Sequence, residues 1–408
     1  MFILLRHLSW TTVLILIAVI TTSAQPEPVF LGDINQEEDG SNPRNFIVVD
    51  SYAYFIASSG IGYEVWRTDG TEEGTVPLTW FNDRFEDTDW KYLIGYDRFR
   101  FIVQTVDGIY VTNGLESSLQ KISDVGVEAE VYVVGDLIFW DEPDQASSSE
   151  LVFASSGLTA STRLILEVNA LNRVIDLDET ALISVIDKDG NPITIKYDGS
   201  SQSFTTFVEA DVLAADEADD LYYFTAIEHA QGQFQLYSKN KFTDQVDQLT
   251  SFNDTLIADY NNHETSAIAL GGAVFFTKLV ERNGQIEQTP ELHRYQAGQV
   301  ELVGNQQERG FEPVFIYSTF SGVLMLDRNN LYQVSADGSQ TVLHNDRWIL
   351  DGYSSVYHVW DDNRIHYFTG FPGNTNLVVS DGSPFGTHVV SINSAIGRVA
   401  LEVGMTNV

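Results

Sequence analysis

The stretch that decides the fold is YEVWRTDGTEEGT, at residues 63–75. Tyr, Val, Trp and Thr among its first six residues are strong strand formers. Asp69-Gly70 then predicts a tight turn, because glycine readily adopts positive φ and an aspartate side chain caps nearby amides. Gly74 lets the chain reverse, and Thr75 opens the next strand. The stretch therefore predicts two strands joined by a capped turn.

The same order of short apolar runs and turns recurs over residues 45–393. The aligned turns fall at Asp69, Asn113, Ser156, Asp198, Asn240, Ala297, Asp337 and Asp381, with spacings of 44, 43, 42, 42, 57, 40 and 44 residues. A period of about 40–50 residues, with four strands in each unit, is typical of β-propeller blades. We therefore predict an all-β fold, a β-propeller of four-stranded blades, and the eight turns favour eight blades over seven.

The apolar runs also indicate how the sheets pack. Many are apolar at consecutive positions, as at 47–49, 131–134 and 274–276. A continuous apolar strand is buried on both faces, as expected where one sheet packs between two others. The last run of each unit is more polar, as at 203–206 and 245–248. That polarity is expected of an outer edge that faces solvent.

The stretch at 63–75 and a second copy, NLVVSDGSPFGT at 376–387, resemble the ELWxxDGTxxGT repeat of secreted bacterial β-propeller-like proteins. The six middle copies keep the strand order but not the motif, as in IYVTNGLESSL and LVFASSGLTAS. The resemblance implies a propeller in an exported protein and no known catalytic residues. We interpret the motif as a structural turn, with metal or glycan binding by its aspartates as the alternative. Its residues are Trp66, Asp69, Gly70, Thr71, Gly74 and Thr75 in the first copy and Asp381, Gly382, Gly386 and Thr387 in the last.

Residues 1–24 have the pattern of a secretory signal peptide. A short basic region at Arg6 and His7 precedes an apolar core, and Thr22-Ser23-Ala24 places small residues before a cleavage site. The apolar run is too short and too polar for a membrane anchor. We therefore divide the chain into a signal peptide (1–24), an N-terminal strand and linker (25–44), the propeller repeats (45–393), and a C-terminal tail or closing strand (394–408).

Composition limits the compartment and the partners. The 408 residues include 58 Asp+Glu, 22 Lys+Arg and no cysteine, for a formal net charge of −36. Such a charge argues against a nucleic-acid partner, which would be repelled. The lack of cysteine excludes disulfides and cysteine-ligated metals. We expect a secreted, periplasmic or cell-surface monomer with no transmembrane segment after signal cleavage.

The best candidate for a metal site is the segment Asp187-Lys188-Asp189-Gly190-Asn191. Asp187, Asp189 and Asn191 place oxygen ligands at alternate positions, as in calcium loops. However, the glycine is at the fourth position rather than the sixth, and Asp198 rather than glutamate is at the twelfth. The segment also has the composition of a hairpin tip. We therefore expect no cofactor, with Ca²⁺ as a weak alternative.

No catalytic motif emerges from the sequence. Acidic groups recur between the units, at 37–39, 83–89 and 216–220, and we interpret them as solubilising charge. We therefore expect a non-enzymatic exported binding protein whose ligand is a glycan or a protein. One alternative is a propeller enzyme that acts on glycans as a hydrolase or lyase, with carboxylates held about 5–10 Å apart at the mouth of the channel. A second alternative is a structural unit of a larger surface assembly.

Overall fold

The structure is a computed structural model of the chain. It describes residues 41, 44–59, 62–78, 90–144, 147, 149–177, 180–199, 203–228, 233–252, 267–282, 285–303, 315–319, 322–326, 330–345, 356–358, 365–371, 374–380, 383–384 and 387–390. The expected signal peptide (1–24), the tail (394–408) and most of the segment 25–44 lie outside the described residues.

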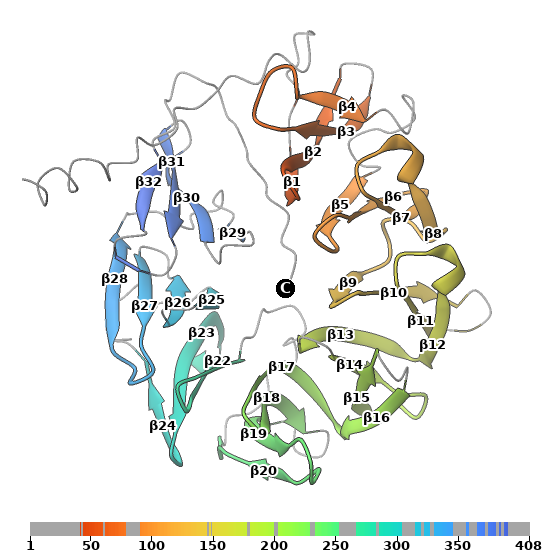
Figure 1. Ribbon diagram of the computed structural model, residues 1–408. Coiled ribbons are helices and arrows are strands. Elements are labelled where there is room, and N and C mark those ends of the chain that lie inside the picture. The colour runs from red at the N-terminus through yellow and green to blue at the C-terminus, as the bar shows by residue number, and fades with distance from the viewer. Residues whose placement is uncertain are drawn as a thin grey trace, which may run out of the picture. The chain divides into compact units, whose positions relative to one another are not determined.

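The described residues form eight four-stranded antiparallel sheets, in each of which the spatial order of the strands follows the chain (Figure 1). Sheets 1 to 4 consist of β1 (Arg44–Val49), β2 (Tyr52–Ser58), β3 (Tyr63–Thr68) and β4 (Val76–Leu78); β5 (Trp90–Gly95), β6 (Phe101–Thr105), β7 (Gly108–Thr112) and β8 (Gln120–Ser123); β9 (Val131–Val134), β10 (Leu137–Pro143), β11 (Glu150–Ser155) and β12 (Arg163–Val168); and β13 (Ala170–Leu177), β14 (Thr180–Ile186), β15 (Pro192–Asp198) and β16 (Ser203–Val208).

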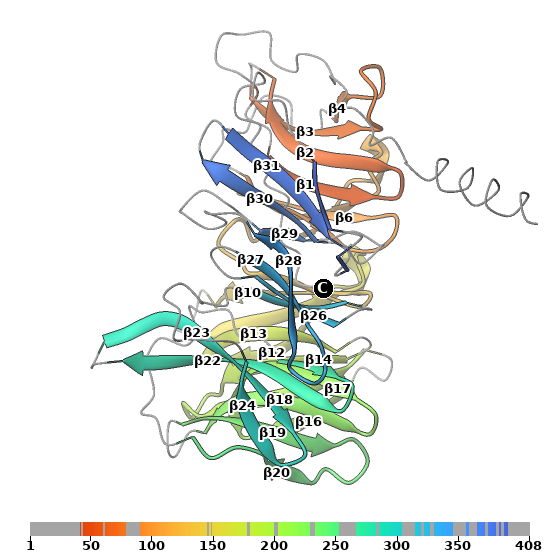
Figure 2. The same cartoon turned by 90° about the vertical axis from the view of Figure 1, so that its left-hand side faces the viewer.

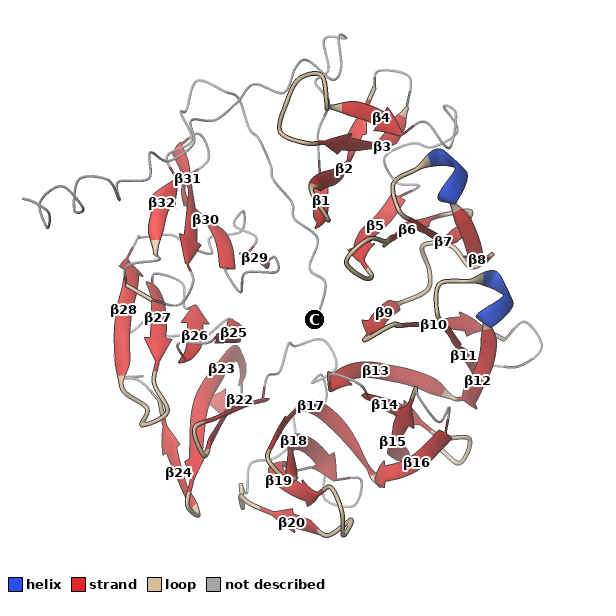
Figure 3. Ribbon diagram, in the orientation of Figure 1, coloured by secondary structure: helices blue, strands red, loops and turns tan. Residues whose placement is uncertain are grey.

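Sheets 5 to 8 consist of β17 (Ala210–Ala218), β18 (Leu221–Glu228), β19 (Phe234–Asn240) and β20 (Val246–Gln248); β21 (Ala267–Leu270), β22 (Ala273–Arg282), β23 (Gln285–Gln296) and β24 (Gln299–Leu302); β25 (Phe315–Thr319), β26 (Gly322–Leu326), β27 (Asn330–Val334) and β28 (Gln340–Asn345); and β29 (Val356–His358), β30 (Ile365–Phe371), β31 (Asn374–Ser380) and β32 (His388–Val390). The described helical turns are η2 (Glu116–Ser118) and η3 (Thr159–Ser161) (Figure 3).

The repeat predicted from the sequence is confirmed strand by strand. Each of the seven described turn positions falls between the third and fourth strands of a sheet, or at the last residue of the third strand, and the eighth, Asp381, lies outside the described residues. The long spacing in the sixth unit has one source among the described residues. The polar segment 281–290 extends β22 and β23, which project beyond their neighbours in Figure 2.

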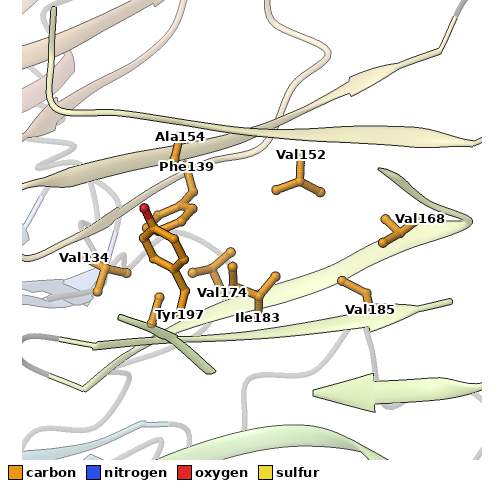
Figure 4. Close-up of a cluster of buried hydrophobic side chains, with 10 residues drawn as sticks. Val134, Phe139, Val152, Ala154, Val168, Val174, Ile183, Val185 and Tyr197 are labelled. Atoms are coloured by element: carbon orange, nitrogen blue, oxygen red, sulfur yellow. The ribbon is translucent and has the colours of Figure 1, made fainter. Parts of the chain in front are cut away.

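Consecutive sheets share buried apolar clusters, which form the core. Figure 4 shows the cluster between sheets 3 and 4, where Phe139 and Val152 of sheet 3 meet Ile183 and Tyr197 of sheet 4. Equivalent clusters join sheets 1 and 2, 2 and 3, 4 and 5, 5 and 6, and 6 and 7. The first strands of several consecutive sheets also lie beside each other, as β13 does with β9 and with β17.

Individual strands supply two of these clusters at once. In β6, Phe101 and Val103 belong to the cluster shared with sheet 1, whereas Ile102 belongs to the cluster shared with sheet 3. All three side chains are 0% exposed. Successive side chains of a strand point to opposite faces, so a continuous apolar run serves two interfaces. The expected burial on both faces is confirmed for the run at 274–276, whereas three of the four residues at 131–134 are only half-buried.

The fourth strands form the outer edges of their sheets. In β16 four consecutive residues, 203–206, are exposed, and all described residues of β20 and β24 are exposed. The chain is thus all-β, with several four-stranded antiparallel sheets in an arrangement consistent with a β-propeller. Among the residues that the structure describes, no helix has the length and apolar composition needed to cross a membrane.

Candidate functional site

The motif at 69–75 forms a self-capped turn between β3 and β4. One oxygen of Asp69 accepts hydrogen bonds from the backbone N–H of Thr71 at 3.0 Å and from its hydroxyl at 2.7 Å. The same hydroxyl accepts a bond from the N–H of Gly74 at 2.9 Å. These bonds lower the pKa of Asp69 below its usual value. Gly70 has φ +89°, a conformation that strongly favours glycine.

Two further hydroxyls close the base of this turn. Thr68 is the last residue of β3, and its Oγ1 lies 2.7 Å from that of Thr75. Thr75 donates its single proton to the backbone carbonyl of Thr71 at 2.7 Å, so Thr68 is the donor within the hydroxyl pair. The Thr68 hydroxyl also accepts a bond from the N–H of Gly70 at 3.0 Å. The polar side chains of the motif therefore form hydrogen bonds with one another and with the backbone of the turn.

The hydroxyl pair persists in sheets whose sequences appeared to have lost the motif. In sheet 2, Thr112 and Ser118 lie 2.8 Å apart, and Ser118 donates to the carbonyl of Leu115 at 2.6 Å. In sheet 3, Ser155 and Ser161 lie 3.1 Å apart. The expectation that the motif is confined to the two end copies is therefore wrong for its hydrogen-bonding core. The signal that could have revealed the relation is Ser or Thr two residues before the turn glycine.

The last copy shows the same pair, although it is only partly described. Ser380 and Thr387 are 2.6 Å apart, and Thr387 donates to the carbonyl of Ser383 at 2.7 Å. The other residues predicted for this copy are outside the described part of the chain; they are Asp381, Gly382 and Gly386.

Trp66 fills space on the face of sheet 1 that is turned away from sheet 2. Its register partner is Phe55, and with Ala57 the two form a buried cluster. The neighbouring pair Ile56 and Val65 belongs instead to the cluster shared with sheet 2. The indole N–H of Trp66 donates to the carbonyl of Ala57 at 3.2 Å. Trp66 and Val65 therefore point to opposite faces of sheet 1.

The predicted calcium segment forms the hairpin tip between β14 and β15. The carboxylate of Asp187 accepts hydrogen bonds from the N–H of Asp189 at 2.9 Å and of Asn191 at 2.8 Å. These backbone bonds lower the pKa of Asp187, chiefly the one from Asn191. Gly190 has φ +84°, as the turn requires. The described residues contain no group of three or more His, Cys, Asp or Glu side chains placed to hold a metal ion. The absence of a cofactor, with Ca²⁺ as the alternative, stays a prediction.

The acidic segments have different outcomes. Those at 37–39 and 83–89 lie outside the described residues. In the third, Asp216 accepts bonds from the N–H of Glu217 and from that of Ala269 in sheet 6, each at 2.7 Å. Glu217 lies 3.1 Å from the ammonium group of Lys241. These carboxylates therefore position the backbone and a neighbouring charge, and their interpretation as solubilising charge stays a prediction.

Sequence reasoning missed a buried polar cluster between sheets 4 and 5. Ser184 of β14 donates to a carboxylate oxygen of Asp211 of β17 at 2.6 Å. Thr194 of β15 donates to the carbonyl of Ala210 at 2.8 Å and accepts a bond from Val212 at 3.2 Å. Ser184 and Thr194 are both 0% exposed. A substrate therefore has no access to either hydroxyl, and the cluster joins the two sheets.

Arg173 of β13 extends this cluster toward sheet 3. It donates to the carbonyl of Leu213 at 3.0 Å. Burial lowers the pKa of Arg173, while the charges of Asp211 and Tyr132 oppose that shift. Burial also raises the pKa of Tyr132 of β9, with the nearby Glu130 as a further cause. Arg173 is the one basic residue of β13, and this was the sequence signal for its role. Its partners could not be identified from the sequence, because they are in other sheets.

Cations lie over aromatic rings across several of the interfaces between sheets. Arg163 of sheet 3 lies 5.9 Å from the ring centroid of Tyr197 in sheet 4, and Lys196 of sheet 4 lies 4.8 Å from that of Tyr222 in sheet 5. Lys239 of sheet 5 is buried and lies 4.9 Å from that of Phe207 in sheet 4. Such contacts stabilise packing. The chain has only 22 Lys and Arg residues against 58 Asp and Glu residues, and several of these cations lie at the interfaces between sheets.

No family model matches the sequence, and no curated protein matches it. Among solved structures, the chain is similar to one from an analysis of two prolyl endopeptidases (9% identity, TM-score 0.46), to puromycin hydrolase (10%, 0.42), and to the β-propeller domain of the Trilobed protease from Pyrococcus furiosus (12%, 0.41). These matches cover 84%, 88% and 86% of this chain. The chain spans 54%, 62% and 96% of the respective structures. The match to β-propeller domains of this peptidase group is distant and assigns the chain to no family.

Proposed function

We propose that the chain is an exported, eight-bladed β-propeller that binds a glycan or a protein partner without catalysing a reaction. One observation carries the non-enzymatic part. The polar groups at the two described candidate sites are engaged with the protein's own backbone and hydroxyls. Asp187 caps a hairpin tip, and Asp211 accepts a bond from the fully buried Ser184.

Closure into a ring of eight blades is supported by sheet 1. Phe55, Ala57 and Trp66 are 2%, 0% and 7% exposed, although they lie on the face turned away from sheet 2. Side chains with such small exposed fractions must be covered by another part of the protein. In a closed ring that cover is the last blade, sheet 8, which would remove the exposed sheet faces of an open stack. The closed arrangement leaves the loops at the two ends of the ring as binding surfaces.

Export is supported by the N-terminal pattern, which matches a secretory signal peptide at residues 1–24. We therefore propose a secreted, periplasmic or cell-surface location, and the mutual repulsion of chains with a net charge of −36 favours a monomer. The same charge favours cationic over anionic partners.

A screen of residues 25–408 against a glycan library tests the binding function. A ligand that binds only the folded chain raises the melting temperature by mass action. Each glycan that does so is then incubated with the chain, with and without Ca²⁺, and analysed by mass spectrometry. Stabilisation with unchanged glycan supports the proposal. The appearance of cleaved glycan would instead establish the alternative, a glycan hydrolase or lyase.

A further inference from the structure

A tyrosine–arginine pair in sheet 1 stands where the next two sheets have apolar pairs. Tyr54 of β2 is the register partner of Arg67 of β3, which directly precedes the hydroxyl residue at the base of the turn. The equivalent pairs in sheets 2 and 3 are both apolar; they are Ile102–Val111 and Phe139–Ala154. The turns of those sheets keep the hydroxyl pair without an arginine. The turn itself therefore does not require Arg67.

The guanidinium group of Arg67 has unused hydrogen-bonding capacity. It lies over the ring of Tyr52, with its Cζ 4.6 Å from the ring centroid. Its Nε is buried and has no hydrogen-bond partner. Within the part of the chain that the structure describes, no carboxylate lies at ion-pair distance from this group. An arginine is always charged and offers five N–H donors, so this half-buried cation can still bind an anionic group.

Two phenol groups lie beside this cation. The ring centroids of Tyr52 and Tyr54 are 6.5 Å apart. Burial raises the pKa of Tyr54, and the nearby charge of Arg67 opposes that shift. A Cβ on Gly114 would lie 2.2 Å from the Tyr54 hydroxyl oxygen, so the turn glycine of sheet 2 leaves room for this hydroxyl. Neither phenol forms a hydrogen bond to any other described residue. One cation and two hydroxyls therefore lie together where sheets 1 and 2 meet.

The surrounding charges limit which anion this place can take. The charge of Asp50 acts on Tyr54, and the pKa of Asp69 is lowered in small part by the charge of Arg67. These two carboxylates, and the formal net charge of −36, repel a ligand with several negative charges. A single carboxylate on an otherwise neutral molecule meets far less repulsion and can pair directly with Arg67.

We propose that Arg67, Tyr52 and Tyr54 bind a uronic acid, the single carboxylate-bearing sugar of an otherwise neutral glycan. The planar guanidinium group matches a carboxylate through two parallel hydrogen bonds. A phenol hydroxyl both donates and accepts, which suits the hydroxyls of a sugar ring. The carboxylate at the end of a peptide has no such hydroxyls beside it. This inference rests on the proposed binding function and names the class of glycan.

Isothermal titration calorimetry with residues 25–408 tests the inference. The probe is xylotriose that carries one glucuronic acid. The comparison ligands are the methyl ester of this probe, which keeps every sugar but removes the charge, and unsubstituted xylotriose. Because the lost interaction is a charged hydrogen-bonded pair, we expect the acid to bind at least about tenfold more tightly than either comparison ligand.

Substitutions locate the binding to this place. Arg67→Val introduces the residue type that sheet 2 has at the equivalent position, so the fold should be kept, while binding of the acid should weaken at least about tenfold. Arg98→Val removes a positive charge from an exposed turn of sheet 2 and should have little effect. Tyr52→Phe keeps the ring beside Arg67, removes one hydroxyl and should weaken binding about threefold or more. Circular dichroism spectra and melting temperatures verify that the variants fold.

Three outcomes would overturn the inference. They are the absence of binding by the acid, equal binding of its methyl ester, and equal losses in Arg67→Val and Arg98→Val, which would indicate a general effect of net charge. An uncharged peptide with a free C-terminal carboxylate is titrated as well. If it binds through Arg67 at least as tightly as the acid, the site belongs to a protein terminus instead. The glycan screen covers neutral glycans too, so their stabilisation of the chain would keep the proposed binding function when the acid fails.

Discussion

The carboxylate of Asp69 occupies the space that a side chain at position 74 would need. A Cβ built on Gly74 would lie 1.9 Å from Oδ1 of Asp69, far closer than any real contact. The same carboxylate is held by the backbone N–H and the hydroxyl of Thr71. The second glycine of the motif is therefore required by the aspartate five residues before it, which explains why the two residues occur together in DGTxxGT.

Gly74→Ala should therefore destabilise the protein by about 1–3 kcal/mol, because either the Asp69 cap or the backbone must move. The free energy of unfolding in urea measures this loss. Gly95→Ala is a matched control, since a Cβ at position 95 meets nothing within 4 Å. Equal stability of the two variants would show that the cap of Asp69 contributes nothing.

The stabilising effect of Asp69 should depend on pH. Its hydrogen bonds lower its pKa in the folded state below the usual value of 3.8. A carboxylate with a lowered folded-state pKa stabilises the protein above its unfolded-state pKa, and this contribution is lost as the pH falls through the folded-state value. The difference in unfolding free energy between wild type and Asp69→Asn should therefore shrink as the pH falls below about 4.

The hydroxyl pair of sheet 3 should be energetically coupled. Ser155 and Ser161 lie 3.1 Å apart, and each contacts the backbone of the turn. In a double-mutant cycle of Ser155→Ala and Ser161→Ala, we expect a coupling energy of about 0.5–1.5 kcal/mol. Additive effects of the two substitutions would show that the network seen in sheet 1 has no energetic counterpart in sheet 3.

Arg173 should stabilise the junction of sheets 3, 4 and 5. Arg173→Met removes the bond to the carbonyl of Leu213 and the charge near Asp211, and it should cost about 1.5–3 kcal/mol. Asp211→Asn should recover part of this loss in the double variant, because the remaining buried group is then neutral. If the double variant loses as much unfolding free energy as the two single variants together, Arg173 and Asp211 are not energetically coupled.

Much of the fold was predictable because it depends on local patterns. Turn residues and runs of β-branched and aromatic side chains determine strands and hairpins within about 40 residues. The consecutive apolar residues at 274–276 also predicted burial on both faces, since side chains alternate along a strand. Turn residues together with the order of the apolar runs were sufficient to place the seven turn positions that the structure describes.

The candidate sites were less predictable, because they depend on contacts between units. Arg173 and Asp211 belong to different sheets, and nothing in either local sequence marks the other as a partner. Thr112 and Ser118 in sheet 2 correspond to Thr68 and Thr75 in sheet 1. The sequence did not reveal this relation, because the two hydroxyl residues are six positions apart in sheet 2 and seven in sheet 1. Both turns keep the glycine and the Thr two residues before it, whose hydroxyl accepts a hydrogen bond from the glycine N–H.

The central claim is that the first and last sheets meet in a closed ring. The chain has no cysteine, so pairs of introduced cysteines can be spin-labelled without background. Pulsed electron paramagnetic resonance would compare Glu73→Cys with Pro384→Cys in sheet 8, with Ser117→Cys in the adjacent sheet 2, and with Asp244→Cys in sheet 5. A closed ring predicts that the distance from sheet 1 to sheet 8 is close to that from sheet 1 to sheet 2 and clearly shorter than that to sheet 5. A distance to sheet 8 as long as that to sheet 5, or longer, would contradict the claim.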